Sequence, residues 1–174
     1  MKKFFAFLLL PVMLFAFASC TEAARPDYAM LAKRLGAVNE NYAFEYFDMF
    51  NYEDTYHVYL SVNNEDDVLL SMHTDDAGNI DDLTVTANIE NFKTDAEKNA
   101  LSDFFTAVIN SYCELAADER EELAENLSFH KPESYFTDLY EKYSSLRHNF
   151  IFSSNAEFVC LYCEYYEIMD DPTR

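Results

Sequence analysis

The chain has 174 residues, with 32 Asp and Glu against 12 Lys and Arg, which gives a formal net charge of −20 at pH 7. Nucleic acid phosphates and anionic lipid repel so acidic a chain, so both are disfavoured as partners. Only two glycines occur, Gly36 and Gly78. Phosphate-binding loops, dinucleotide fingerprints and nucleophile elbows need several glycines at fixed offsets, so the sequence excludes them and predicts no cofactor.

The N-terminus has the pattern of an export signal. Lys2 and Lys3 precede an apolar run over 4–17, which is shorter than the roughly 20 residues that span a bilayer. The run ends at Phe17-Ala18-Ser19-Cys20, which resembles the lipobox of bacterial lipoproteins. The resemblance implies cleavage before Cys20, a diacylglycerol on its sulfur, and attachment to the cell membrane or outer membrane on the extracytoplasmic side. Ordinary signal cleavage near Ala18 is the alternative.

Removal of residues 1–19 as a signal leaves a mature chain with 10 basic and 32 acidic residues, a net charge of −22. Its contact with the membrane would come from the lipid and not from charge, and basic proteins or divalent cations remain as partners. Eleven of the sixteen Phe and all thirteen Tyr lie beyond the signal, and they suffice for a packed core. We expect a lipidated Cys20 with a short tether over 20–27, and a single domain over 28–174.

Strand-like periods dominate the first half of this domain. A short helix is expected over 28–35, closed by Gly36. Four strand-like runs follow, separated by polar, turn-rich segments that indicate a meander. The runs cover 42–50, which is less regular, and then 55–62, 68–72 and 82–89.

After residue 94 the apolar residues recur at helical spacing, and a predicted hairpin follows near the C-terminus. Thr94 and Glu97 form a capping box, and six apolar residues at helical spacing come after it: Leu101, Phe104, Phe105, Val108, Tyr112 and Cys113. A short helix is expected over 118–127 and another after Pro132, marked by Phe136, Leu139, Tyr140, Tyr143 and Leu146. The closing hairpin pairs 149–153 with 157–166. The order predicts an α+β fold, an antiparallel sheet (four-strand meander plus C-terminal hairpin) with helices packed on one face.

The simplest hairpin loops set a register, in which Phe50 pairs with Thr55, Val62 with Val68, and Asp75 with Ile80. That register places four apolar residues on the helix-facing side: Phe47, Val58, Met72 and Leu83. On the other face it aligns Asp48, His57, His73 and Asp82 in one row. With strands about 4.8 Å apart the row is too long to close on one metal ion. Only the two histidines with one flanking Asp could bind a metal, so His–Asp pairing is the favoured interpretation.

Cys160 and Cys163 have the spacing of a redox motif. On a strand, however, residues three apart point to opposite faces, which disfavours a redox role. Cys113 lies on the helical stripe and could meet whichever of the two faces the core. The default interpretation is that these cysteines are small buried side chains.

Aromatic side chains on the open sheet face are the candidate contact surface for a protein or glycan. Tyr42, Phe44, Tyr46 and Phe50 alternate along the first predicted strand, and Tyr59 lies on the next one. The leading hypothesis is a noncatalytic, membrane-tethered binding module. One alternative is an envelope hydrolase that uses His57 or His73 with a neighbouring Asp. The other is a small envelope-assembly or inhibitor lipoprotein.

Overall fold

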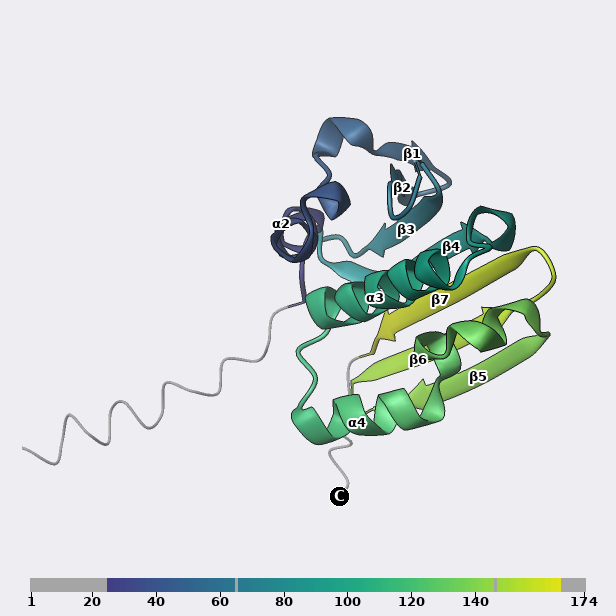
Figure 1. Ribbon diagram of the computed structural model, residues 1–174. Helices are drawn as coiled ribbons and strands as arrows, with labels where there is room; N and C mark the ends of the chain where they lie inside the picture. Colours follow the sequence, from purple (N-terminus) through teal and green to yellow (C-terminus); the bar gives the residue numbers. More distant parts are fainter. Residues whose placement is uncertain (1–24, 65, 146, 167–174) are drawn as a thin grey trace, which may run out of the picture.

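The computed structural model describes residues 25–64, 66–145 and 147–166. They form one seven-stranded antiparallel sheet with strand order β1-β2-β3-β4-β7-β6-β5. The described α-helices lie on one face of this sheet (Figure 1). The structure confirms the α+β class, the four-strand meander and the C-terminal hairpin. The strands are β1 (Phe50–Tyr52), β2 (Thr55–Leu60), β3 (Val68–Thr74), β4 (Ile80–Asn88), β5 (Leu139–Ser144), β6 (His148–Ser154) and β7 (Phe158–Tyr165).

The helical layer contains α2 (Tyr28–Val38), α3 (Asp95–Tyr112) and α4 (Ala117–Asn126). The predicted capping box starts α3, because Thr94 Oγ1 accepts from the backbone N–H of Glu97 at 3.3 Å and Glu97 Oε2 accepts from that of Thr94 at 2.7 Å. The short helix expected over 118–127 is confirmed as α4. Short 3-10 helices, η3 (Ile89–Asn91) and η4 (Ser128–His130), follow β4 and α4.

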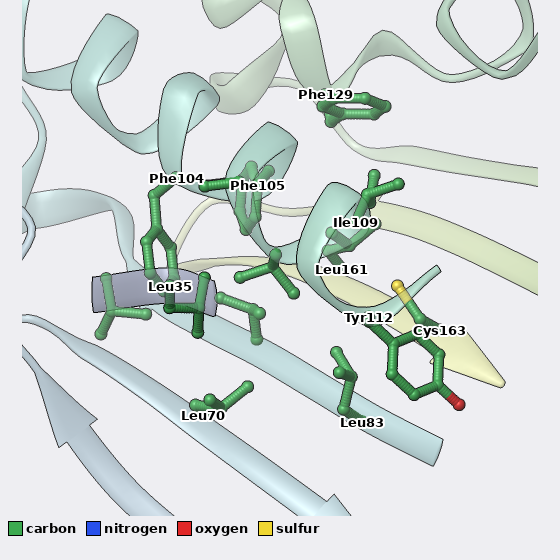
Figure 2. Close-up of a cluster of buried hydrophobic side chains, with 14 of the residues drawn as sticks. Leu35, Leu70, Leu83, Phe104, Phe105, Ile109, Tyr112, Phe129, Leu161 and Cys163 are labelled. Atoms are coloured by element: carbon green, nitrogen blue, oxygen red, sulfur yellow. The ribbon is translucent and has the colours of Figure 1, made fainter. Parts of the chain in front are cut away.

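The core lies between α3 and the central strands (Figure 2). Helix α3 crosses the middle of the sheet over β4 and β7 (Figure 1), and its buried side chains meet the inward-facing residues of the strands. Each fully buried Leu, Ile or Phe stabilises the fold by roughly 1.5–3 kcal/mol. The cluster includes Leu70, Leu83, Phe104, Phe105, Ile109 and Leu161, each at most 2% exposed.

Residues 42–50 do not form the strand that their alternating aromatics predict. Two 3-10 helices, η1 (Glu40–Tyr42) and η2 (Tyr46–Asp48), precede the three-residue strand β1. The side chain of Asn39 caps η1, and the ring of Tyr42 packs edge-on against Phe104 of α3 with centroids 4.8 Å apart. The prediction was wrong because capped turns and packing beneath the helices determine this segment.

The helix expected after Pro132 is replaced by the 3-10 helix η5 (Pro132–Phe136) and strand β5. Side chains of β5 alternate in burial, and the carboxylate of Glu141 accepts the hydroxyl of Ser128 at 2.7 Å. Apolar positions 139 and 143 fit a helical period as well as an alternating one. The segment forms a strand because it pairs with β6. Leu146, part of that expected helix, lies outside the described residues.

Residues 25–27, which the sequence assigns to the tether, pair with the rest of the domain. The backbone N–H of Ile80 donates to the carbonyl of Pro26 at 2.9 Å, and Asp27 forms a β-bridge with Asn79. Residues 25–27 therefore belong to the body and not to a tether. Residues 1–24, including the proposed signal and Cys20, lie outside the described residues.

Helix α2 does not end at Gly36, as the sequence predicts, but continues to Val38. A Cβ atom at Gly36 would lie only 3.0 Å from the Cβ of Ala43. Glycine is used here because the segment after the helix folds back closely against it.

Candidate functional site

The two-residue turn between β1 and β2 corrects the predicted register. Glu53 and Asp54 have φ angles of 50° and 62°, as expected for a type I′ hairpin. The turn pairs Tyr52 with Thr55 and Phe50 with His57. The prediction that Phe50 pairs with Thr55 was wrong, because neither Glu nor Asp marks such a turn as Asn-Gly would.

The loop between β2 and β3 is two residues longer than predicted, because β2 ends at Leu60 while β3 begins at Val68. The carboxylate of Asp67, which is buried, accepts three backbone N–H groups: from Val62 at 2.8 Å, from Asn63 at 2.8 Å and from Asn64 at 2.6 Å. Leu60 therefore pairs with Val68, where the sequence predicted Val62. At the next turn Thr74, and not Asp75, pairs with Ile80.

These corrections break up the predicted row of His and Asp. His57 lies opposite Ser71, and its Nδ1 is 2.8 Å from the Ser71 hydroxyl oxygen. Asp48 lies in η2 and not on a strand. Within the described segments, no three His, Cys, Asp or Glu side chains are placed to hold a metal ion together.

His73 and Asp82 do lie opposite each other, on β3 and β4. His73 Nδ1 is 3.5 Å from Asp82 Oδ2. Burial raises the pKa of the Asp82 carboxyl, the charge of His73 partly offsets that rise, and nearby Glu164 adds to it. The three line a hollow of about 400 Å³ that also includes Arg25, Asp75, Asp81 and Tyr165. Arg25 pairs with Asp75 at 2.9 Å and also with Asp81, so its charge is already matched by carboxylates.

The candidate contact residues divide into two groups. Tyr42 and Phe44 are buried beneath the helices, so the structure contradicts their predicted place on the open face. Tyr46, Phe50 and Tyr59 are exposed as predicted, and the structure adds two neighbours, Phe47 and Tyr52. We call this set the aromatic cluster: Tyr46, Phe47, Phe50, Tyr52 and Tyr59, all exposed.

The aromatic cluster wraps around the β1 edge of the sheet. Phe50, Tyr52 and Tyr59 lie on the face away from the helices, because they alternate with the inward-facing residues of their strands. Phe50 stacks on His57 with centroids 5.1 Å apart. On the other side of the edge, Tyr46 contacts Tyr28 of α2 at 5.6 Å. An exposed apolar surface of this kind marks interaction sites in soluble proteins.

Phe47 is the most exposed member of the cluster, at 78%. The predicted register places it in the core with Val58, Met72 and Leu83; those three are buried, but Phe47 is not.

A hollow of about 330 Å³ adjoins Tyr59. We call it the Tyr59 hollow. Its apolar part comes from Phe44 and Val58, and its polar part from two carboxylates, an amide and a hydroxyl. The polar residues are Asp48, Asp66, Asn41 and Ser61.

The cysteines are free thiols in the described chain. Cys163 is the core-facing member of the 160–163 pair, whereas Cys160 lies on the open face, 3.7 Å from the Thr86 hydroxyl. Burial raises the pKa of both the Cys113 and the Cys163 thiols, and the proximity of Cys163 raises that of Cys113 further. Such thiols are poor nucleophiles.

Comparison with protein-family models, with curated proteins and with solved structures found no match to this chain. No helix in the described parts of the chain is both long and apolar enough to cross a membrane.

Proposed function

We propose that this protein is a lipid-anchored, extracytoplasmic binding module that contacts its partner through the aromatic cluster and performs no catalysis. The observation that carries the proposal is the exposure of five large aromatic side chains around one sheet edge. Aromatic side chains dominate the binding energy of protein interfaces, because each buries a large area at a small cost in conformational entropy. They also stack on sugar rings, so a glycan is the other partner class.

The proposed anchor would lie close to this surface. Five peptide steps join Cys20 to Arg25 and reach at most about 17 Å. Tyr28, three residues further on, contacts Tyr46 of the aromatic cluster. A lipid on Cys20 would therefore present the cluster to partners at the membrane.

Replacement of the acylated residue tests the anchor. A Cys20→Ser protein should leave the membrane fraction and lose fatty-acid label, while the wild type retains both. A variant that stays membrane-bound at full length would show that residues 4–17 themselves hold the protein in the membrane.

Photo-crosslinking in cells tests the contact surface. A photoreactive phenylalanine analogue at position 47 should give a discrete crosslinked product. The same analogue in place of Tyr140, which is 70% exposed on β5 at the opposite sheet edge, is the matched control. Products from position 140 but not from position 47 would place the contact surface elsewhere.

The hydrolase alternative has one supporting contact, the 2.8 Å approach of His57 Nδ1 to the Ser71 hydroxyl. A nucleophilic serine also requires a group that orients the histidine and donors for the developing oxyanion. If His57→Gln abolished the protein's cellular role while Phe47→Ser preserved it, the enzyme would replace the binding module. An envelope-assembly or inhibitor lipoprotein would be one form of the binding module.

A further inference from the structure

The segment that carries the aromatic cluster is strongly acidic, and Arg25 pairs with two of its carboxylates, Asp75 and Asp81. No Lys or Arg occurs between Arg34 and Lys93, and that stretch holds thirteen Asp and Glu residues. It includes η1, η2 and strands β1 to β4, which form one side of the sheet (Figure 1). A partner that docks on this side meets a negative potential, which favours cationic groups and repels anionic ones.

Carboxylates alternate with the exposed rings at the edge itself. Glu45 and Asp48 flank Tyr46 and Phe47, and Glu53 and Asp54 follow Tyr52; all four acidic side chains are exposed. A surface of aromatic faces between carboxylates suits a guanidinium group, which stacks on a ring and donates in its own plane.

The Tyr59 hollow concentrates these two features. One carboxylate oxygen of Asp48 accepts from the backbone N–H of Glu45 at 2.8 Å, and no described residue donates to the other oxygen. The Asp66 carboxylate likewise has no donor in the described chain, because Asp66 contacts Ser61 only through its own backbone N–H, at 3.3 Å. Both carboxylates thus retain acceptor capacity beside an exposed ring.

We propose that the Tyr59 hollow binds a cationic side chain, arginine in the first place, of a basic polypeptide partner. The proposal deepens the binding function and rests on it. A volume of about 330 Å³ admits one such side chain. The ring of Tyr59 would stack on the guanidinium plane, and Asp48 and Asp66 would accept its N–H groups. The apolar lining from Phe44 and Val58 would contact the methylene stem.

Charge decides against the other occupants. The same carboxylates repel anionic lipid and acidic glycans, because the charges have the same sign. This holds even though the proposed lipid anchor would lie nearby. A divalent cation needs several converging oxygen ligands, and no such group occurs among the described residues. The arginine side chains of a basic polypeptide can both stack on the rings and donate to the carboxylates.

Titration of the full-length Cys20→Ser protein with an arginine-rich peptide tests the proposal by NMR. The peptide should shift the backbone amides of Tyr59 and Ser61, and added salt should weaken its binding. The same peptide with citrulline in place of arginine keeps the shape without the charge, and it should bind at least about tenfold more weakly. Equal binding of the two peptides would overturn the proposal.

Matched variants locate the site. Asp48→Asn with Asp66→Asn should weaken binding of the arginine peptide by about fivefold or more, whereas Asp118→Asn with Glu121→Gln, the same charge change on α4, should change it less than about twofold. Tyr59→Leu should also weaken binding, and Tyr140→Leu on the opposite edge should not. Retained amide dispersion in the spectrum shows that each variant is folded. If both double variants lost the same affinity for the arginine peptide, the binding would come from the overall negative charge and not from the Tyr59 hollow, and the proposed site would be wrong.

Vesicles of phosphatidylcholine separate the lipid alternative. If vesicles shift the aromatic cluster and the arginine peptide does not, the occupant is lipid and the proposed cationic ligand is wrong. That outcome still leaves the aromatic cluster as the contact surface. Failure of the wider binding proposal would appear separately, as the absence of crosslinks from position 47.

Discussion

The ring of Phe50 stacks on the ring of Tyr59, with centroids 6.1 Å apart and planes inclined at 24°. The two residues lie on neighbouring strands, and Phe50 also stacks on His57. The three rings therefore form one continuous aromatic strip at the free edge of the sheet. Exposure of such a strip to water is unfavourable in free energy, and a bound partner would cover it.

Two phenylalanines should differ sharply in their effect on stability. Phe105→Ala removes a fully buried ring of α3, so the free energy of unfolding should fall by about 3–5 kcal/mol. Phe47→Ser removes a ring that is already exposed, and the change should stay within about 0.5 kcal/mol. Urea unfolding measures both. A large loss for Phe47→Ser would mean that this ring is part of the core and unsuited to a partner.

The Asp67 carboxylate should be essential to the loop between β2 and β3. Asp67→Asn replaces one acceptor oxygen by a donor, so at least one of the three N–H groups loses its partner. The free energy of unfolding should fall by about 2–3 kcal/mol, as measured by denaturant titration. Its exposed neighbour provides the control, because Asp66→Asn should cost less than about 0.5 kcal/mol. Equal effects of the two substitutions would refute the role of Asp67.

Stability should decrease as the pH falls below neutrality, because of His148. Burial among Tyr112, Phe150 and Tyr165 lowers the pKa of His148 to about 4; nearby Arg147 lowers it further, and Glu119 opposes the shift. Between about pH 6.5 and 4 the unfolded chain binds a proton that the folded chain does not, so the free energy of unfolding falls by up to about 1.4 kcal/mol per pH unit.

Thermal unfolding of a His148→Phe protein isolates this contribution. Between pH 6.5 and 5, above the range in which most carboxylates titrate, the variant should have a flatter stability profile than the wild type. His130→Gln, at an exposed histidine, should retain the wild-type slope. An unchanged slope in His148→Phe would assign the effect to another group.

Thiol reagents should distinguish the three cysteines of the folded body. Burial raises the pKa of Cys113 and Cys163, so few thiolates form and both should react only after unfolding. Cys160 is half-buried on the open face and should react first in the native protein. In a Cys20→Ser background, a Cys160→Ser protein should therefore be resistant to a maleimide until denaturant is added. Rapid native labelling of that variant would contradict the packing of α3 against β7.

The sequence predicts most of the fold where one local signal dominates. Alternation along β2, β3 and β4 identifies the meander, and Thr94 with Glu97 identifies the start of α3. Positions 139 and 143 fit two periods equally, so only pairing with β6 could reveal β5. Residues 42–50 alternate like a strand, but packing under α3 and the Asn39 cap override that pattern.

The candidate site was harder to predict because it depends on register. His73 and Asp82 lie opposite each other as predicted, because an irregularity between His73 and Thr74 restores the register that the turn itself shifts by one residue. His57 falls elsewhere because the Asp67 loop shifts β2 by two residues against β3. The exposure of Phe47 follows from the 3-10 turn of η2, for which propensity and period give no strong signal.

Hydroxyl-radical footprinting of the aromatic cluster tests the central claim most directly, by comparing intact cells with the purified protein. Tyr52 and Tyr140 are matched reporters, 63% and 70% exposed on opposite edge strands. If the cluster binds a partner, oxidation of Tyr52 and Phe47 should be strongly reduced in cells while that of Tyr140 is unchanged. Equal oxidation of Tyr52 in cells and in the purified protein, with Tyr140 protected instead, would contradict the assignment of the aromatic cluster as the contact surface.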